Sequence, residues 1–396
     1  MRTFSVPAEI IERLPAARLL GPFAELSDPR VRRTRRHELI DIIVIGLLTI
    51  FCGGEGWEDM VDFGHAREAW LGEFLSLPNR IPCADTFRRV FAALNPMEFQ
   101  QCFLRWLDAL EKSARPIDRT VAIDGKTLRG SFDTAAGQSP IHLVHAWAAD
   151  SGILLGQLAT QAKSNEITAI PALVKMLDIA DATVTIDAMG CQKEIASTII
   201  DGRGDYVLAL KGNHENFHDD VVVLFDDVLK NGTHAAVASD YSESTNGDHG
   251  RIETRRVWTV HDVSWFAEYD QWKGLASLAL VESIRESGDK ITTERRYFIS
   301  SLRDVSASRM SSIVRSHWSV ENSLHWSLDV AFSEDASRVR RDHGPENLGM
   351  LRRVALQLLK LDKTSKRGLA AKARLAAYKP DYLIKVLLSG FGTTSG

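Results

Sequence analysis

The chain has 396 residues, of which 44% are hydrophobic and 25% charged, and its net charge is −4. These values are typical of a globular protein of two or three domains and exclude a disordered or fibrous chain. Four cysteines without Cys-x-x-Cys spacing argue against a disulfide framework and a cysteine-based zinc site. There is no secretory signal at the start, and the most apolar stretch, 39–52, is interrupted by Asp41 and shorter than the ~20 residues that cross a bilayer. We therefore expect a cytoplasmic protein with no membrane partner.

The sequence predicts a helical N-terminal domain over residues 1–115. The apolar helix expected over 39–52 is preceded by a basic run, 32–36, and followed by Gly53 and Gly54, which are typical of a helix C-terminus. An amphipathic helix over 97–112 closes this region. The basic run either forms surface salt bridges or contacts phosphate, and both alternatives stay open.

Two apolar runs further along the chain end in an aspartate that is followed by small residues. The run 121–123 leads into Asp124, and the β-branched run 182–186 leads into Asp187. Each run predicts a buried strand, and a carboxylate at its end is costly to desolvate unless it is paired or holds a cation. If both strands lie in one sheet, their carboxylates lie close together at one edge. Oxygen ligands of this kind suit Mg²⁺, with Mn²⁺ as a possible substitute.

The order of the elements after residue 116 predicts an α/β fold. Three strands, a helix, a strand, a helix and a strand follow one another between 116 and 231, the order of a ribonuclease-H-like mixed sheet with flanking helices. A β-rich segment, 232–302, interrupts this core, and helix returns over 303–343. Residues 344–396 are expected to form a basic helical tail, because 338–379 holds twelve Lys or Arg against three acidic residues. Such a segment either binds a polyanion or is a solvated face.

A third acidic residue is expected on a helix, at Glu321. On a regular helix it shares a face with three apolar residues at −3, +3 and +7, which are Trp318, Leu324 and Leu328. This spacing predicts that the carboxylate points into the protein, where a positive charge would be needed to offset its burial. The alternative is a glutamate at the rim of this face that forms a salt bridge with Arg315 or another cation.

Two histidines flank Glu321 on the same helical face, His317 four residues before it and His325 four residues after it. This spacing suggests a zinc site as an alternative, but the His-Glu-x-x-His pattern is absent and no cysteine is near in the sequence. We expect instead that the histidines contact DNA phosphate or orient the glutamate.

Five sequence stretches, together with the helix around Glu321, are shared with one known family. The stretches are AIDGKTLRG (122–130), KSNEITAI (163–170), IDAMGCQ (186–192), DYVLALKGN (205–213) and HGRIETR (249–255). Together they resemble the DDE-type transposases of bacterial insertion sequences, in the retroviral-integrase-like superfamily, and especially the branch that includes the H-repeat-associated proteins. The resemblance implies that Asp124, Asp187 and Glu321 hold two Mg²⁺ ions in a ribonuclease-H-like core. It also implies a β-rich insertion before the third acid and an N-terminal domain that helps to bind transposon ends.

One departure from this family concerns the third acid. Related transposases carry Tyr, Arg and Lys at −7, −4 and +7 from the glutamate, where this chain has Val314, His317 and Leu328. The phosphate contacts that the family makes with those residues must then come from other positions. Asp329 is kept as the alternative third acid.

The resemblance implies a homodimer that binds double-stranded DNA, both the transposon ends and the target. It would cut phosphodiester bonds by two-metal-ion hydrolysis and join the freed 3′-hydroxyl to target DNA, associating with the nucleoid when bound. The candidate DNA contacts are Lys126, Arg129, Lys211, Arg251, Arg315, His317, His325, Arg352 and Arg353. Two alternatives are a resolvase-type nuclease of the same fold and a domesticated DNA-binding protein that no longer cuts.

Overall fold

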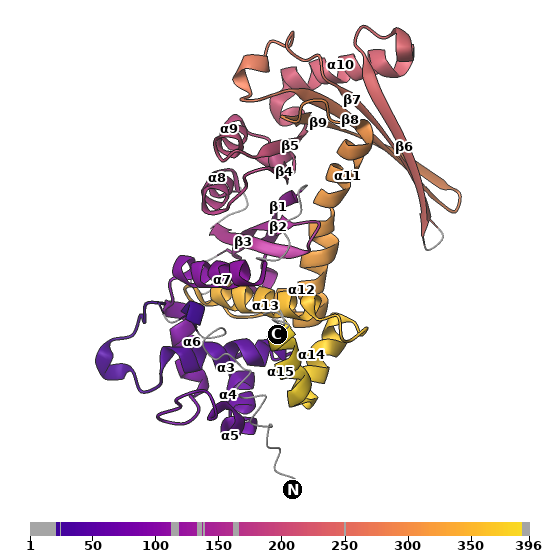
Figure 1. Ribbon diagram of the computed structural model, residues 1–396. Helices are drawn as coiled ribbons and strands as arrows, with labels where there is room; N and C mark the ends of the chain where they lie inside the picture. The colour runs from indigo at the N-terminus through magenta and orange to yellow at the C-terminus, as the bar shows by residue number, and fades with distance from the viewer. Residues whose placement is uncertain are drawn as a thin grey trace, which may run out of the picture.

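The computed structural model describes residues 21–23, 25–111, 119–132, 137, 139–160, 166–248 and 251–389. A nine-stranded sheet forms its centre, with the N-terminal helices at one end of the molecule and strands β6 to β9 at the other (Figure 1). Over the described ranges, no helix is both long and apolar enough to cross a membrane.

The strands of the sheet follow the order β3-β2-β1-β4-β5-β9-β8-β7-β6. β1 is antiparallel to β2 and parallel to β4, β2 is antiparallel to β3, and β4 is parallel to β5. The bounds of this half are β1 (Arg119–Thr127), β2 (His142–Ala148), β3 (Ile153–Thr160), β4 (Ala182–Ile186) and β5 (Asp205–Leu210). An antiparallel meander whose first strand lies beside two parallel strands confirms the predicted ribonuclease-H-like mixed sheet.

The pairing of β1 with β4 brings the two predicted aspartates together. Every residue of β4 is buried, and its β-branched side chains suit a central strand that is covered on both faces. The register pairs Ile123 of β1 with Ile186 of β4. Asp124 and Asp187 are the next residues in these parallel strands, so their side chains leave the same face of the sheet at neighbouring positions.

The β-rich segment after residue 232 belongs to the same sheet. β9 is antiparallel to β5, and the sheet continues through β8 and β7 to β6. The bounds are β6 (Ser239–Asp248), β7 (Arg251–Val260), β8 (Ser277–Ser287) and β9 (Lys290–Ser300). The sequence does not predict β6, because the strand is polar and lacks the alternation of apolar and polar residues that identifies a half-buried strand.

Helices cover both faces of the sheet. α8 (Glu166–Met176) and α9 (Lys193–Asp201) pack on one face, α10 (Glu215–Asn231) packs on β9, and α11 (Ala307–His317) crosses the opposite face from α8 and α9 (Figure 1). α11 buries Met310, Ile313 and Val314 in a cluster with apolar residues of β5 and β7 to β9. At its C-terminal end, the imidazole of His317 is hydrogen-bonded to Thr185 of β4 at 3.1 Å. This packing brings the segment after α11 to the edge where β1 and β4 end.

The N-terminal region is helical, as predicted. Its helices are α3 (Leu39–Phe51), α4 (Trp57–Ala66), α5 (Glu68–Leu71), α6 (Ala84–Ala93) and α7 (Pro96–Glu111). Residues 41–51 of α3 are all buried, which fits its position at the centre of this helical group. The carboxylate of Asp41 is satisfied there by the backbone N–H groups of Ser76 and Leu77, at 3.3 and 2.9 Å.

The helix that begins the expected basic tail is not a solvated helix. α13 (Gly344–Leu361) is buried from residue 344 to 359 and packs against α3, α6 and β3. Figure 1 shows α13 between the N-terminal helices and the β3 edge of the sheet, followed by α14 (Leu369–Tyr378) and α15 (Pro380–Ser389). Because protein surrounds α13, its arginines do not form an exposed basic face. The residue boundaries between the domains stay predictions.

Candidate active site

Backbone N–H groups fix both strand aspartates at the edge of the sheet. Asp124 accepts a hydrogen bond from the backbone of Gly125 at 2.9 Å. Asp187 caps the short 3₁₀ helix over Ala188–Gly190, and its Oδ1 accepts from the N–H groups of Met189 and Gly190 at 3.1 and 3.3 Å. The small residues after Asp187 let the chain turn sharply beyond β4, whereas β1 continues past Asp124 to Thr127, paired with β2.

The electrostatic surroundings of Asp124 favour an added cation. Burial is the main cause that raises the pKa of Asp124 to about 7, against the lowering effect of the Gly125 hydrogen bond. The negative charges of Asp187, Glu166 and Glu321 raise the pKa further. Three other carboxylates therefore act on Asp124, and a bound cation would relieve their mutual repulsion.

Glu321 lies near this edge but does not point into the protein interior. It opens a π-helix, Glu321–His325, between α11 and α12 (Trp326–Phe332), and its side chain is exposed, whereas Leu324 and Leu328 are buried. The prediction of a buried glutamate is wrong, because a π-turn contains more than 3.6 residues and breaks the register that relates Glu321 to the apolar residues after it. In the part of the chain that the structure describes, no three His, Cys, Asp or Glu side chains converge tightly enough to hold a metal ion.

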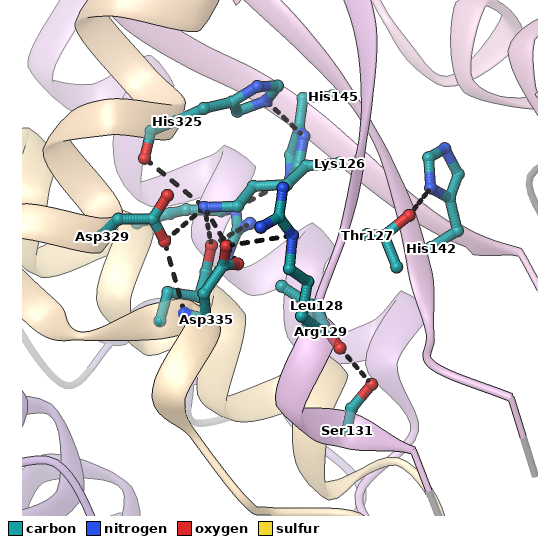
Figure 2. Close-up of polar contacts among 12 residues, drawn as sticks. Lys126, Thr127, Leu128, Arg129, Ser131, His142, His145, His325, Asp329 and Asp335 are labelled. Atoms are coloured by element: carbon teal, nitrogen blue, oxygen red, sulfur yellow. Dashed lines mark hydrogen bonds and ion pairs between the residues drawn. The ribbon is translucent and has the colours of Figure 1, made fainter.

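Asp329, the alternative third acid, is already paired with a cation. Its carboxylate lies 2.7 Å from the Nζ of Lys126, on β1 (Figure 2). The same ammonium lies 3.4 Å from Glu334 and 3.6 Å from Asp335. A carboxylate that neutralises a lysine is a poor metal ligand, so this geometry favours Glu321 as the third acid.

The two basic residues of the AIDGKTLRG stretch differ in exposure: Lys126 is buried and Arg129 faces solvent. The side chain of Lys126 is only 8% exposed and is surrounded by three carboxylates, so the prediction that it contacts DNA phosphate is wrong. Arg129 is exposed, with its Nε 3.6 Å from Asp335. Gly130 lies against the backbone of Ser337, where an added Cβ would be 2.2 Å from the carbonyl oxygen. The stretch thus joins β1 to the segment after α12.

Arg352 and Arg353 are the clearest corrections to the predicted DNA contacts. They are 2% and 1% exposed in the middle of α13. Arg353 forms a bidentate ion pair with Glu334, at 2.7 and 3.2 Å. Arg352 donates a hydrogen bond to the backbone carbonyl of Glu55, at 3.4 Å. Neither guanidinium reaches solvent, so the prediction that they contact phosphate is wrong.

The other predicted contacts have different surroundings. Lys211 is exposed and lines a cavity of about 110 Å³ beside Asp187, together with His317. His317 is mostly enclosed there, and burial lowers its pKa. Arg315 is exposed on α11, whereas His325 is mostly buried, with its Nδ1 3.6 Å from Oδ2 of Asp124. The side chain of Arg251, at the start of β7, is outside the described residues.

The structure adds an acidic residue that sequence analysis did not identify as part of the site. Glu166, the first residue of α8, forms a buried ion pair with His142 of β2. An added Cβ on Gly125 would lie 2.3 Å from His142 Nε2 and 2.5 Å from a Glu166 oxygen, so only glycine fits beside Asp124. Figure 2 shows Thr127 hydrogen-bonded to His142, at 2.9 Å. The signal for Glu166 was its place in the KSNEITAI stretch, whose residues 163–165 are outside the described residues.

A groove runs from Glu321 across strands β6 to β9. It has a volume of about 1100 Å³ and is lined by Arg255, Arg285, Arg296 and Arg315 together with Trp318 and Glu321. Burial lowers the pKa of Arg255, Glu253 raises it, and the charges of Arg315 and Arg285 lower it again. Arg315 and Arg285 are therefore close enough to Arg255 to repel it. Carboxylates already pair with the arginines of the sheet, Glu253 with Arg255 and Arg285, both at 3.2 Å, and Glu294 with Arg296 at 2.8 Å.

The chain was compared with known proteins. The transposase DDE domain matches residues 115–358, and the DDE_Tnp_1-associated region matches residues 20–107. The chain is 37% identical to a protein of Escherichia coli O157:H7 that is provisionally named the transposase YncI, over 94% of each chain. It is 38% identical to the H repeat-associated protein YhhI of Escherichia coli strain K12, also provisionally named a transposase, over 91% of this chain and 95% of YhhI.

Among solved structures, the piggyBac transposase synaptic complex with hairpin DNA, determined by cryo-EM, matches 98% of this chain and 84% of that chain. The TM-score is 0.42 at 12% identity, so this likeness is too distant to carry a conclusion, and the fold rests on the strand order instead. The domain match and the two full-length relatives agree with each other. The chain belongs to the DDE transposase family.

Proposed function

We propose that this chain cuts DNA at transposon ends and joins the resulting 3′-hydroxyl groups to target DNA. The observation that supports this most strongly is the position of Asp124, within β1, and Asp187, directly after the adjacent parallel strand β4, at neighbouring positions on the same face of the sheet. The raised pKa of Asp124 also supports it, because the carboxylate is half-buried and lies among other negative charges. A site of this kind binds cations, and in the DDE transposase family the reaction that uses them is phosphodiester cleavage.

Asp124, Asp187 and Glu321 are the residues that would hold two Mg²⁺ ions, or Mn²⁺ in their place. Their hard oxygen donors fit these metals, and the repulsion felt by Asp124 is what a bound cation would relieve. When bound, the ions would activate the attacking water or 3′-hydroxyl and stabilise the leaving oxygen. The protein's own part is to orient the carboxylates, through the N–H groups of Gly125, Met189 and Gly190.

The groove next to Glu321 is the proposed path of duplex DNA. Arg315 and the arginines of β7 to β9 would neutralise phosphates along it and position the scissile bond at the three acids. Because two transposon ends must be cut together, we propose a homodimer on DNA.

Strand transfer tests this function directly. A duplex that carries a pre-cut transposon end with a free 3′-hydroxyl, taken from the DNA beside the gene, is incubated with the protein, Mg²⁺ and a supercoiled target plasmid. We expect covalently joined products in which the end is attached to the plasmid. Cutting of intact ends without joining would support a resolvase-type nuclease, and binding without either reaction would support a domesticated DNA-binding protein.

The identity of the third acid can be tested with two single substitutions. Glu321→Gln is expected to reduce Mg²⁺-dependent cutting by orders of magnitude with little change in melting temperature, because the side chain is exposed. Asp329→Asn is expected to lower the melting temperature, because it breaks the contact with Lys126, and to affect cutting less. If Asp329→Asn abolishes cutting while Glu321→Gln does not, the assignment must be reversed.

The proposed DNA path can be tested at Arg315. This residue is exposed beside Glu321 and forms no ion pair with the described residues. Arg315→Ala should weaken the binding of all duplex sequences alike and reduce the slope of log K against log salt by about 0.9. Lys230→Ala, an exposed cation on α10 away from the groove, is the control and should leave the slope unchanged. An unchanged slope for Arg315→Ala would exclude a phosphate contact there.

A further inference from the structure

Two histidines form a bridge between the buried Arg353 and Asp124. His145, on β2, is fully buried, and His325 ends the π-helix that begins at Glu321. Their rings meet edge to face, with centroids 5.3 Å apart, and Figure 2 shows the hydrogen bond between them. The spacing of His325 from Glu321 marks it in the sequence, whereas nothing distinguishes His145 within its apolar strand.

The hydrogen bonds in this bridge run in one direction, which Arg353 determines. Its guanidinium has donors and no acceptor, so its Nε donates to Nε2 of His145, at 3.0 Å. His145 must then carry its proton on Nδ1, which lies 3.3 Å from Nε2 of His325. His325 accepts on Nε2 and carries its own proton on Nδ1, the atom that lies 3.6 Å from Oδ2 of Asp124.

Both histidines are neutral in this arrangement, since each uses one ring nitrogen as an acceptor. The group that faces Asp124 is therefore a neutral N–H dipole. A neutral donor orients a carboxylate without placing a positive charge beside it that would compete with a bound cation.

The far end of the bridge is held firmly. Arg353 is fixed by Glu334, at 2.7 and 3.2 Å, and by the carbonyl oxygen of Gly349, at 2.7 Å. An added Cβ on Gly349 would lie 2.8 Å from the guanidinium, so the space around Arg353 is filled. The chain of contacts thus runs from α13 through β2 and the π-helix to β1, and it ends on a carboxylate of the candidate site.

We infer that His145 and His325 are positioning residues that orient the Asp124 carboxylate for metal binding: two directed hydrogen bonds anchored on Arg353 hold the uncharged Nδ1–H of His325 against it, at 3.6 Å. This inference rests on the proposed function, because it takes Asp124 as a metal ligand. The bridge also links β1 to the π-helix that carries Glu321, so the same contacts that orient one acid fix the helix of another. Loss of such a supporting contact typically weakens metal affinity about 10- to 100-fold.

The histidine tautomers give the most direct test. In the full-length protein labelled with ¹⁵N-histidine, two-bond ¹H–¹⁵N correlations at pH 7 distinguish Nδ1–H from Nε2–H rings. The signals of His145 and His325 are identified by their loss in His145→Leu and His325→Leu. We expect both rings to be neutral and protonated on Nδ1. Protonation of either ring on Nε2, or on both nitrogens, would overturn the inference.

Metal binding without DNA gives the second measurement. The melting temperature is followed against Mg²⁺ and Mn²⁺ concentration for wild type, His325→Leu, His325→Asn and the control His261→Leu. His325→Leu should raise the half-saturating concentration 10- to 100-fold, and His325→Asn, which keeps an N–H near the position of Nδ1, should raise it less. His261→Leu, in the loop after β7, should not change it.

These outcomes separate the inference from the proposed function. Equal half-saturating concentrations in wild type and His325→Leu would overturn the positioning role even if the enzyme cuts and joins DNA. A wild-type protein that neither binds Mg²⁺ or Mn²⁺ nor joins strands would contradict the proposed function, while the tautomers would still show whether the directed chain exists.

Discussion

Asp124→Asn and Asp187→Asn are each expected to reduce Mg²⁺-dependent cutting of transposon-end DNA by about 10³-fold or more. The amide keeps the shape of the side chain but removes the charge, and a metal ion contributes several kcal/mol to such a transition state. DNA affinity in a gel shift should stay near wild type, because the proposed phosphate contacts lie in the arginine-lined groove. Asp62→Asn, on an exposed position of α4, is the control. A mutant that cuts at the wild-type rate would remove that aspartate from the site.

Asp124→Asn, which should abolish most cutting, should increase the stability of the metal-free protein. Burial, with the neighbouring carboxylates, raises the pKa of Asp124 from its ordinary 3.8 to about 7. Between pH 4 and 7 the folded protein therefore keeps a proton that the unfolded chain has lost, so stability falls as the pH rises, by up to about 4 kcal/mol. Without metal, Asp124→Asn should melt above wild type at pH 8 and close to it at pH 4. Mg²⁺ at pH 8 should stabilise wild type more than the variant. Identical pH profiles of the melting temperature in the two proteins would show that the pKa of Asp124 is not raised.

Arg353→Met is expected to be the most destabilising single change in the C-terminal region. It leaves the fully buried carboxylate of Glu334 without its main partner, which typically costs about 3–5 kcal/mol. Burial raises the pKa of Glu334, but Arg353 and Lys126 more than offset this and lower it overall. Thermal melts should therefore show a drop of several degrees that is larger at pH 8 than at low pH, where protonated Glu334 no longer needs a cation.

Two further variants show whether the pair itself is responsible. Arg352→Met changes the neighbouring buried arginine, which bonds a backbone carbonyl and, within the described residues, no carboxylate, so it should destabilise less. The double variant Arg353→Met, Glu334→Leu should recover most of the loss, because replacing both members of a buried ion pair by apolar groups is often neutral. If the double variant is as unstable as the sum of its single changes, the two residues do not act as a pair.

The central part of the fold could be predicted because its sequence pattern is local. Apolar and β-branched runs that end in aspartate define β1 and β4, and the order of the elements then defines the ribonuclease-H-like sheet. β6 could not be predicted, because it joins the sheet through backbone hydrogen bonds to β7, which its polar side chains do not reveal. Strand pairing of this kind depends on tertiary context more than on residue type.

The candidate site was predicted less completely, for two physical reasons. The π-turn at Glu321 changes the helical register, and residue spacing alone does not reveal where such a turn occurs. The sequence shows that Lys126 and Arg353 are basic, but it does not show that Lys126 pairs with Asp329 and Arg353 with Glu334. No spacing pattern connects the members of either pair. For this reason the sequence predicted DNA contacts at two basic residues that instead form buried ion pairs.

The packing of α13 on α3 has a consequence for synthesis on the ribosome. α3, whose residues 41–51 are all buried in the finished protein, is translated roughly 300 residues before α13, against which it packs. At a translation rate of about 5–20 residues per second, roughly 15–60 s pass between the synthesis of this apolar helix and that of α13. During that time it depends on chaperones or on provisional contacts within the N-terminal helices. Nascent chains that stop before residue 344 should therefore aggregate, and a cell that makes this protein quickly exposes more of them at once.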